Sequence, residues 1–311
     1  NDLSDLIKFK WSKIVVDKTQ TKSISPLHYH HISSIDLYQK IHELELFYQW
    51  DKLFAPVEEI IKNEDGTCIV VNGMPIHGEI IFDSRTPIYK KNKKGETHIF
   101  QSFIGWEIET LLPIQDPAAC RLMDFDIAQN NFTQFMYVLP FTTNTTLVEL
   151  TRFGTTVLGE KEANDLLNTY IQNHFGEFTI KTVEKGCIPM SNCEIENESF
   201  ENVILLGAKN YAIKPSTGYA FKSMYHRACE VANSLEQSLV TSNNTTYQNS
   251  KTGRFAFYDS LLLIILKDKP QKGKKIFQEL FNKSEVSLVL KFLDQKTTLK
   301  EDILLFAKLP W

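Results

Sequence analysis

Apolar residues recur every three to four positions in several parts of the chain, the period of an amphipathic helix. Helices are predicted at residues 33–47, 160–174, from the loop at 207–218 to about Leu239, and through 254–311. Ser33 and Ser34 suit the N-cap of the first helix, and Asp36 places a negative charge in its first turn. A polar stretch at 241–251 is predicted to be a linker before a helical C-terminal region.

Shorter apolar runs bounded by Gly, Asn and Asp predict strands. These strands cover residues 57–61, 67–71, 79–82, 98–111, 121–129, 134–139, 146–152, 178–184 and 203–206. The four strands between 98 and 152 are separated by short polar joins, which predicts an antiparallel meander. The flanking segments instead alternate strands with helices. We therefore expect a second domain to be inserted into an α/β domain.

Composition narrows the class of protein. Of the 311 residues 42% are hydrophobic, which allows one large or two modest domains with a real core. Phenylalanine occurs 21 times, which fits either a Phe-rich core or a site for a large apolar or conjugated ligand. The net charge of −4 gives no whole-chain electrostatic case for binding nucleic acid.

Five cysteines without a C-x-x-C motif predict reduced thiols in the cytoplasm, and no metal site is expected. No apolar run approaches the roughly 20 residues that span a bilayer. Lysines cluster at 267–275 beside the apolar stretch 261–266, which indicates either a solvated helix face or contact with anionic lipid. The chain is expected to be soluble or peripherally attached to a membrane.

The most informative loop lies between a predicted strand and the next helix, at residues 207–218. A helix N-terminus presents unpaired N–H groups to phosphate or to a flavin carbonyl oxygen. Gly218 removes a side chain that would block a flat cofactor, and Pro215 stiffens the approach. No G-x-G-x-x-G motif occurs, and Gly makes up 13 of the 311 residues. A nucleotide-binding protein of this composition looks truncated at its N-terminus.

Several motifs occur together in one order. They are Gln101-Ser-Phe-Ile-Gly-Trp106-Glu107-Ile-Glu109, Leu122-Met-Asp124-Phe-Asp126, Phe135-Met-Tyr137-Val-Leu-Pro140-Phe141, Leu147-Val-Glu149-Leu-Thr151, Lys214-Pro-Ser-Thr-Gly-Tyr219, Lys291-Phe-Leu-Asp294 and Leu309-Pro-Trp311. In order and spacing the chain resembles the lycopene beta-cyclase family from Trp11 onward. The resemblance implies that a Rossmann-type segment of the family would lie before Asn1.

The resemblance implies an α/β fold class. The implied structure contains a partial Rossmann-like FAD-binding domain of the glutathione-reductase/hydroxylase type, an antiparallel β-sheet substrate domain and a helical C-terminal tail. The expected boundaries are 1–97 for the first part of the FAD-binding domain, 98–190 for the substrate domain, 191–240 for the return to the FAD-binding domain and 241–311 for the helical region.

The implied reaction closes ψ end groups of lycopene into β-ionone rings, with no net redox change. Protonating an alkene requires a carboxylic acid that keeps its proton near neutral pH, as burial of a glutamate allows. Glu149 matches the family's essential acid and lies between apolar residues on a predicted strand; a glutamate on a solvent-facing strand is the alternative. Asp124 matches an aspartate of the family and could share a hydrogen bond with Glu149 or stabilise the cation electrostatically; a structural aspartate at a strand end is the alternative. Glu107 and Glu109 are weaker candidates that share one strand face.

The resemblance also implies reduced FAD, kept reduced by catalytic amounts of a donor such as NAD(P)H. The implied cofactor-binding residues are Asp83, Arg85, Gly207, Pro215, Thr217, Gly218 and Tyr219. Aromatic faces pack against a polyene and attract a developing cation. The aromatic residues proposed to line the lycopene site, or else an ordinary core, are Phe103, Trp106, Phe125, Phe135, Tyr137, Phe141 and Phe153.

One segment departs from the family pattern. Ala208-Lys209-Asn210-Tyr211 stands where the family has small residues or glycine, so flavin binding is expected to be weaker or the loop to be shifted. Two alternatives to the cyclase therefore stay open. One is a flavin-dependent monooxygenase or reductase of the same fold, and the other is a non-catalytic carotenoid- or lipid-binding relic.

Overall fold

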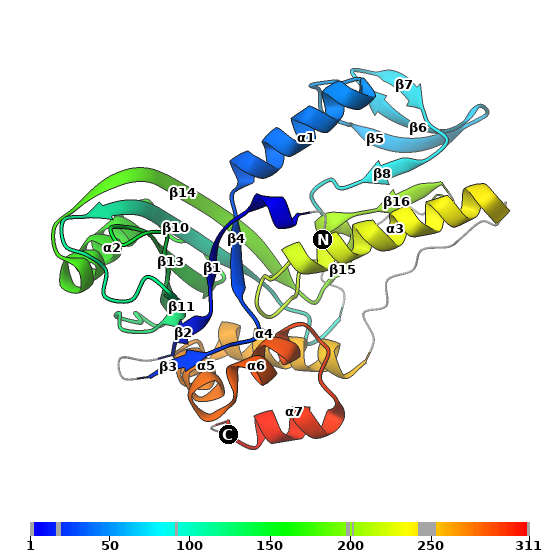
Figure 1. Cartoon of the computed structure of the whole chain (residues 1–311). Helices are drawn as coiled ribbons and strands as arrows, with labels where there is room; N and C mark the ends of the chain where they lie inside the picture. The colour runs from blue at the N-terminus through cyan, green and yellow to red at the C-terminus, as the bar shows by residue number, and fades with distance from the viewer. Residues whose placement is uncertain are drawn as a thin grey trace. The chain divides into compact units, whose positions relative to one another are not determined.

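The strands predicted between residues 98 and 152 form the centre of the largest sheet in the protein. The computed structural model describes residues 3–16, 20–90, 93–196, 200, 202–241 and 253–309. The sheet runs in the order β14 (Phe178–Ser191), β10 (His98–Thr110), β13 (Thr145–Gly154), β12 (Thr133–Pro140), β11 (Ala119–Asp124), β2 (Lys13–Val15) and β3 (Thr21–Ser23) (Figure 1).

The predicted meander is wrong in its first step. β11, β12 and β13 follow one another antiparallel, but β10 pairs with β13 and β14 rather than with β11. β14 has 14 residues, twice the length predicted from 178–184, and it needs a neighbour along that length. The alternation of apolar residues shows which side chains share a face, but it does not show which strand lies beside which.

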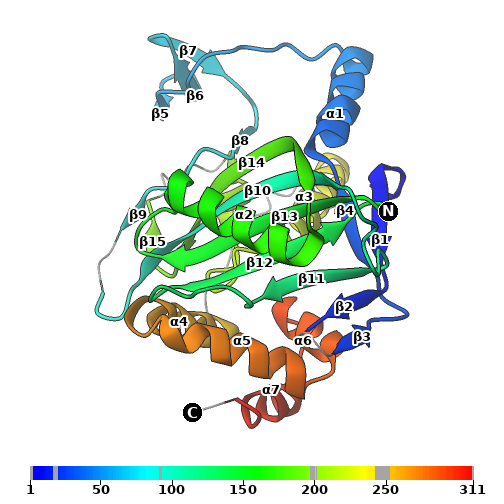
Figure 2. The same ribbon diagram turned by 90° about the vertical axis from the view of Figure 1, so that its left-hand side faces the viewer.

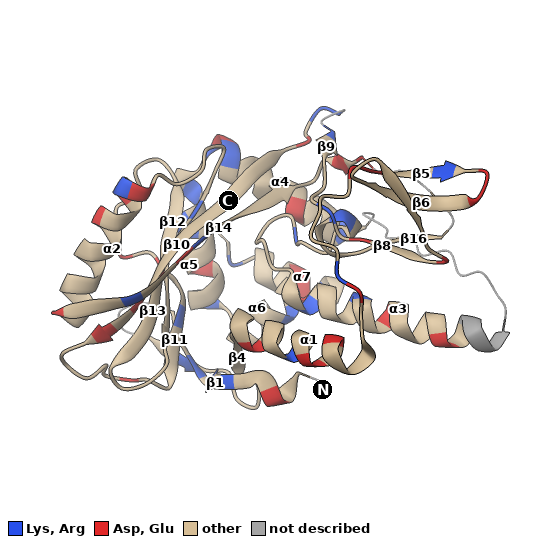
Figure 3. Cartoon of the chain, turned by 90° about the horizontal axis from the view of Figure 1, so that it is seen from above, with Lys and Arg blue, Asp and Glu red and all other residues tan. Residues whose placement is uncertain are grey.

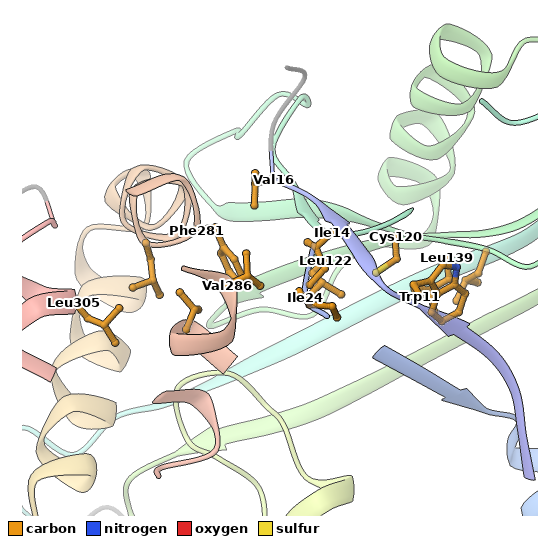
Figure 4. Close-up of a cluster of buried hydrophobic side chains, with 13 residues drawn as sticks. Trp11, Ile14, Val16, Ile24, Cys120, Leu122, Leu139, Phe281, Val286 and Leu305 are labelled. Atoms are coloured by element: carbon orange, nitrogen blue, oxygen red, sulfur yellow. The ribbon is translucent and has the colours of Figure 1, made fainter. Parts of the chain in front are cut away.

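The two faces of this sheet are covered differently. Figure 2 shows α2 (Glu160–Phe175) lying across one face, which confirms the helix predicted at residues 160–174. There Leu167, Tyr170 and Ile171 pack with Trp106 and Val148 in a buried core. The opposite face carries a second core (Figure 4). Its labelled members are Trp11, Ile14, Val16, Ile24, Cys120, Leu122, Leu139, Phe281, Val286 and Leu305.

The C-terminal region is helical, as predicted. It contains α4 (Arg254–Asp268), α5 (Gln271–Lys283), α6 (Val286–Leu293) and α7 (Leu299–Phe306). Pro270 occupies the N-cap position of α5, where it has no need of an N–H group. Thr298 and Glu301 form a reciprocal capping box at the start of α7. Leu280, Phe281, Val289 and Leu305 of these helices enter the second core.

The N-terminal segment adds a short helix, η1 (Ser4–Leu6), and an antiparallel pair, β1 (Ile7–Trp11) with β4 (Tyr29–Ile32). The predicted helix at 33–47 is confirmed as α1 (Ser34–Tyr48). Residues of both charge signs lie along α1 (Figure 3). It ends where Gln49 adopts a left-handed conformation with φ 53°.

The chain divides into two units. The first holds residues 1–49, 99–188 and 264–311, and the second holds 50–98 and 189–263. Residues 1–49, expected in the FAD-binding domain, therefore group with the seven-stranded sheet, because β2 hydrogen-bonds to β11 and Trp11 and Ile14 enter its core. Most of the predicted linker, residues 242–251, lies outside the described residues.

The second unit is built from small sheets and a helix. A three-stranded sheet has the order β5 (Glu59–Asn63), β6 (Gly66–Val71) and β7 (Met74–His77), and the sequence did not predict β7. β8 (Ile81–Asp83) pairs in parallel with β16 (Val203–Leu205), and β9 (Tyr89–Lys90) pairs with β15 (Glu194–Ile195). After η2 (Gly207–Asn210), α3 covers Phe221–Thr241. No helix among the described residues is long and apolar enough to cross a membrane.

Candidate active site

Glu149 lies on the face of the seven-stranded sheet that faces away from α2. On β13 it is the cross-strand partner of Gly105 on β10 and of Tyr137 on β12. Cross-strand partners point to the same face, and successive residues point to opposite faces. Val148 and Leu150 accordingly pack in the α2 core, while Glu149 does not. The predicted strand around Glu149 is confirmed.

A second carboxyl group meets Glu149 from the edge strand β14. The side chains of Glu149 and Glu184 are hydrogen-bonded to each other. They meet above Gly105, where a Cβ atom would lie 3.1 Å from Cγ of Glu184 and 3.2 Å from Cβ of Glu149. Thr151 Oγ1 also donates a hydrogen bond of 2.7 Å to Glu149 Oε1. The missing side chain at position 105 is therefore what lets the two carboxyl groups come together.

Burial and a like-charged neighbour govern the protonation of Glu149. Burial, with a smaller contribution from Glu184, raises the pKa of Glu149 to about 8, although the hydrogen bond from Thr151 acts in the opposite direction. Although the Glu184 side chain is exposed on the edge strand, partial desolvation of its carboxyl group also raises its pKa. A carboxyl group with such a pKa keeps its proton at neutral pH, as a general acid must.

Aromatic groups line the face of the sheet that carries Glu149. Tyr137 donates a hydrogen bond of 2.6 Å to Tyr29 of β4, and burial raises the pKa of Tyr29 to about 12. The His31 ring lies 5.1 Å from the Phe141 ring, between centroids, and burial lowers the pKa of His31. Tyr29 is therefore protonated and uncharged near neutral pH, which suits an apolar substrate and a cation that water would quench.

Asp124 does not share a hydrogen bond with Glu149, and that hypothesis is wrong. Asp124 pairs with Met136, whose side chain packs in the α2 core, so it lies on the other face of the sheet. It accepts hydrogen bonds of 2.7 Å from both Tyr170 and Arg121. Although burial acts in the other direction, these bonds hold the pKa of Asp124 below its usual value. An ionised aspartate bound in this way supports the packing of α2.

The seven predicted aromatic residues fall into three groups. Trp106 lies in the α2 core, on the face away from Glu149, so it cannot line a site there. Phe125, Phe135 and Phe153 are buried against Phe277 of α5. The remaining three are Phe103, Tyr137 and Phe141. Phe103 shares a row of the sheet with Thr151, and its ring occupies the space that a side chain at Gly186 would need.

The second unit brings together the predicted residues at the ends of β8 and β16. Asp83 ends β8 and is the parallel partner of Leu205. Its carboxylate binds Arg85 through two bonds of 2.9 Å and Lys209 through one of 2.6 Å. Despite the opposing effect of burial, these cations hold the pKa of Asp83 at about 2. Lys209, part of the segment that departs from the family, is thus a buried ion-pair partner.

The loop that follows is held in place by α4. Lys214 Nζ lies 2.7 Å from Asp259 Oδ1, and Ser216 donates a bond of 2.5 Å to the same oxygen. Gly218 has φ 71°, and its N–H bonds to the Lys214 carbonyl at 2.9 Å. α3 begins at Phe221, two residues after the predicted helix start that follows the loop at 207–218. The loop at 214–218 is therefore a preformed turn ahead of the helix.

Two further residues of this segment have left-handed backbones. Gly207 has φ 57°, and a Cβ there would meet only Met224 Cε, at 3.9 Å. Tyr211 has φ 55°, and its hydroxyl accepts a hydrogen bond of 3.0 Å from the N–H of Ile195. Tyr211 thus has the left-handed conformation that glycine adopts most easily. Tyr219 is partly exposed, next to the turn.

Sequence reasoning missed Glu184, Gly105, Lys214 and Asp259 as parts of these sites. Glu184 lies in a run of exposed residues on an edge strand, and only the pairing of β14 with β10 brings it to Glu149. Gly105 stands inside a strand, where glycine often marks a close approach of neighbouring groups. That signal was present in the sequence.

Comparison with known proteins gives one family. Residues 1–311 match the lycopene cyclase protein family. The chain belongs to this family. A search of curated proteins finds no match. The family assignment covers the acid-bearing sheet and the loop at 207–218 alike.

Solved structures resemble the chain in fold. A geranylgeranyl bacteriochlorophyll reductase-like protein from Thermoplasma acidophilum has a TM-score of 0.59 and 12% identity, over 98% of this chain and 81% of that one. The flavin-dependent brominase Bmp2 has a TM-score of 0.54 and 9% identity, over 98% and 77%. Such low identities show the fold alone. This lycopene cyclase family member thus has a mixed α/β fold with a multi-stranded sheet.

Proposed function

We propose that the protein is a lycopene cyclase that closes ψ end groups into β-ionone rings by a proton-initiated, redox-neutral reaction. The observation that carries this proposal is Glu149, a carboxyl group whose pKa is raised to about 8 on a sheet face lined by Tyr29, Tyr137 and Phe141. A family member with a protonated glutamate in apolar surroundings has the group that alkene protonation requires.

The proposed step conserves atoms and electrons. The Glu149 carboxylic acid transfers its proton to the terminal double bond, and the resulting cation is attacked by the neighbouring double bond, which forms the ring carbon–carbon bond. The ring then gives a different proton to the Glu149 carboxylate, which restores the acid, so the product is an isomer of the substrate. Uncharged aromatic side chains exclude water and stabilise the cation while it exists.

The loop in the second unit has features that suit a flavin. Thr217 Oγ1 is buried without a hydrogen-bond partner among the described residues, and Gly218 presents backbone with no side chain. We propose that Gly207, Pro215, Thr217, Gly218 and Tyr219 hold FAD, in a domain related to the Rossmann fold through the parallel pair β8 and β16.

Asp83 and Arg85 bind each other, and Lys209 binds Asp83, so this cluster is better suited to shaping the site. Bound in its reduced form, the flavin would supply a negatively charged group.

The decisive variant is Glu149→Gln. It should lower the rate of cyclic product formation at least about 100-fold, because a typical general acid contributes that much, while flavin binding stays unchanged. Glu109→Gln removes an exposed carboxyl group on the same face of β10 and is the control. The assay supplies lycopene in liposomes, FAD and catalytic reductant, and separates the products by chromatography.

The same assay tests the other functions. Wild-type yield of β-carotene from Glu149→Gln would remove Glu149 as the acid. Consumption of NAD(P)H in proportion to product would indicate a monooxygenase or reductase instead. Because lycopene dissolves in lipid, we also propose peripheral membrane contact, which the assay tests by comparing liposomes with detergent.

A further inference from the structure

Three strands bring the Glu149–Glu184 pair together in a way that the reaction itself does not require. Glu184 comes from β14, Glu149 from β13, and Gly105 of β10 lies between them. Any larger residue at position 105 would place its Cβ within 3.1–3.2 Å of atoms of both glutamates. In the part of the chain that the structure describes, neither glutamate has a lysine or arginine partner.

We propose that Glu149 and Glu184 form a carboxylic acid–carboxylate pair that holds one proton across Gly105, with Glu149 as the member that delivers it and Glu184 as the positioning residue that keeps it there. The role in the reaction rests on the proposed cyclase function, whereas the pairing itself rests on the geometry alone. Two adjacent carboxylates repel each other strongly, so such a pair retains a proton that an isolated glutamate would release.

The groups facing the pair do not neutralise it. Tyr137 of β12 and Tyr29 of β4 are hydrogen-bonded to each other, and Tyr29 stays neutral below a pKa of about 12. Glu107 of β10 accepts a bond of 3.2 Å from Thr182 and adds negative charge beside Glu184. His31 of β4, with its lowered pKa, is neutral near pH 7.

The unequal exposure of the two glutamates determines which of them carries the proton. Glu149 is mostly buried, whereas Glu184 is exposed on the edge strand. Desolvation disfavours the charged form, so the proton resides on Glu149 and the charge on Glu184.

The test measures the pair directly, without substrate or flavin. Infrared titration follows the band of the protonated carboxyl group in the wild type and in Glu149→Gln, Glu184→Gln and Gly105→Ala. We expect the wild-type band to persist to about pH 8 and to vanish at pH 7 in Glu149→Gln. In Glu184→Gln its midpoint should fall by about one pH unit, because a like charge is removed. Gly105→Ala should shift it in the same direction.

Gly159→Ala is the matched control for the glycine variant, because a Cβ at Gly159 meets no atom within 4 Å. Cyclisation rates supply the second readout. Glu184→Gln should match the wild type at pH 6 and be about fivefold slower at pH 8, as a one-unit fall of the acid's pKa from about 8 predicts. If Glu184 had a merely structural role, its replacement would lower the rate equally at pH 6 and pH 8.

The outcomes separate this inference from the proposed function. An unchanged midpoint in Glu184→Gln, or a band that survives in Glu149→Gln and is lost in Glu184→Gln, would overturn the pair as assigned. A pair that titrates as expected in a protein that forms no cyclic product from lycopene would leave the inference intact and defeat the cyclase proposal.

Discussion

Tyr211 tests how much a single side chain affects the loop in the second unit. Its φ of 55° costs a residue with a Cβ roughly 1 kcal/mol, while its hydroxyl bond to Ile195 returns a similar amount, about 1 kcal/mol. Tyr211→Gly removes both, so we expect little change in stability and unchanged or tighter FAD binding. Flavin fluorescence during titration measures the affinity.

Tyr211→Phe is the matched control, since it keeps the strained backbone and removes only the hydrogen bond. It should lower the free energy of unfolding by about 1 kcal/mol, measured by urea denaturation. If Tyr211→Gly loses flavin while Tyr211→Phe keeps it, the tyrosine ring itself supports the site, and the loop differs from that of the family.

The candidate acid was predictable from the sequence, but its neighbour was not. Alternation along residues 146–151 places Glu149 on one face with Leu147, and the family motif marks it. Glu184 becomes its partner only because β10 separates β14 from β13, a pairing that no local pattern specifies. Asp124 was misplaced for a related reason, because its face depends on the register of β11 against β12.

At the scale of elements, α5 can pack on β12 only because position 273 has no side chain. A Cβ at Gly273 would overlap the hydroxyl of Thr133 and lie 2.7 Å from its methyl group. Gly273→Ala should therefore lower the free energy of unfolding by about 1–3 kcal/mol, as overpacking typically does, even though alanine favours helix. Thermal unfolding measures the change.

The second variant identifies the cause. Thr133→Ala removes both overlapping groups, together with the bond of 2.6 Å from Thr133 to the Pro270 carbonyl. Combining it with Gly273→Ala should cost less than the sum of the two single changes. Simple additivity would mean that α5 moves freely away from the sheet and that Gly273 does not determine the packing.

The elements themselves were largely predictable, and their arrangement was not. α1, α2 and the C-terminal helices follow from the spacing of apolar residues, and Ser33 occupies the predicted N-cap position of α1. β7 was missed because all of its residues are exposed, which leaves no alternation to detect. The grouping of residues 1–49 with the sheet depends on long-range pairing, as in the parallel contact of β2 with β11.

At the scale of the whole molecule, keeping Glu149 protonated has a cost in stability. Its pKa is about 8 in the folded protein and near 4.5 in the unfolded chain. Between these values the folded state binds more protons than the unfolded state, so the free energy of unfolding falls as pH rises. Below pH 4.5 both states are protonated and no penalty exists, and above pH 8 the penalty is complete.

Glu149→Gln removes this penalty and should stabilise the protein while it inactivates the proposed reaction. At pH 8 the variant should be more stable than the wild type by on the order of 2–5 kcal/mol, from the size of the pKa shift, and at pH 4.5 the two should unfold alike. Unfolding temperatures at both pH values, with Glu109→Gln as the exposed control, measure the effect. Equal stabilities at pH 8 would show that Glu149 ionises in the folded protein as readily as in the unfolded chain, and a carboxyl group of that kind could not serve as the acid.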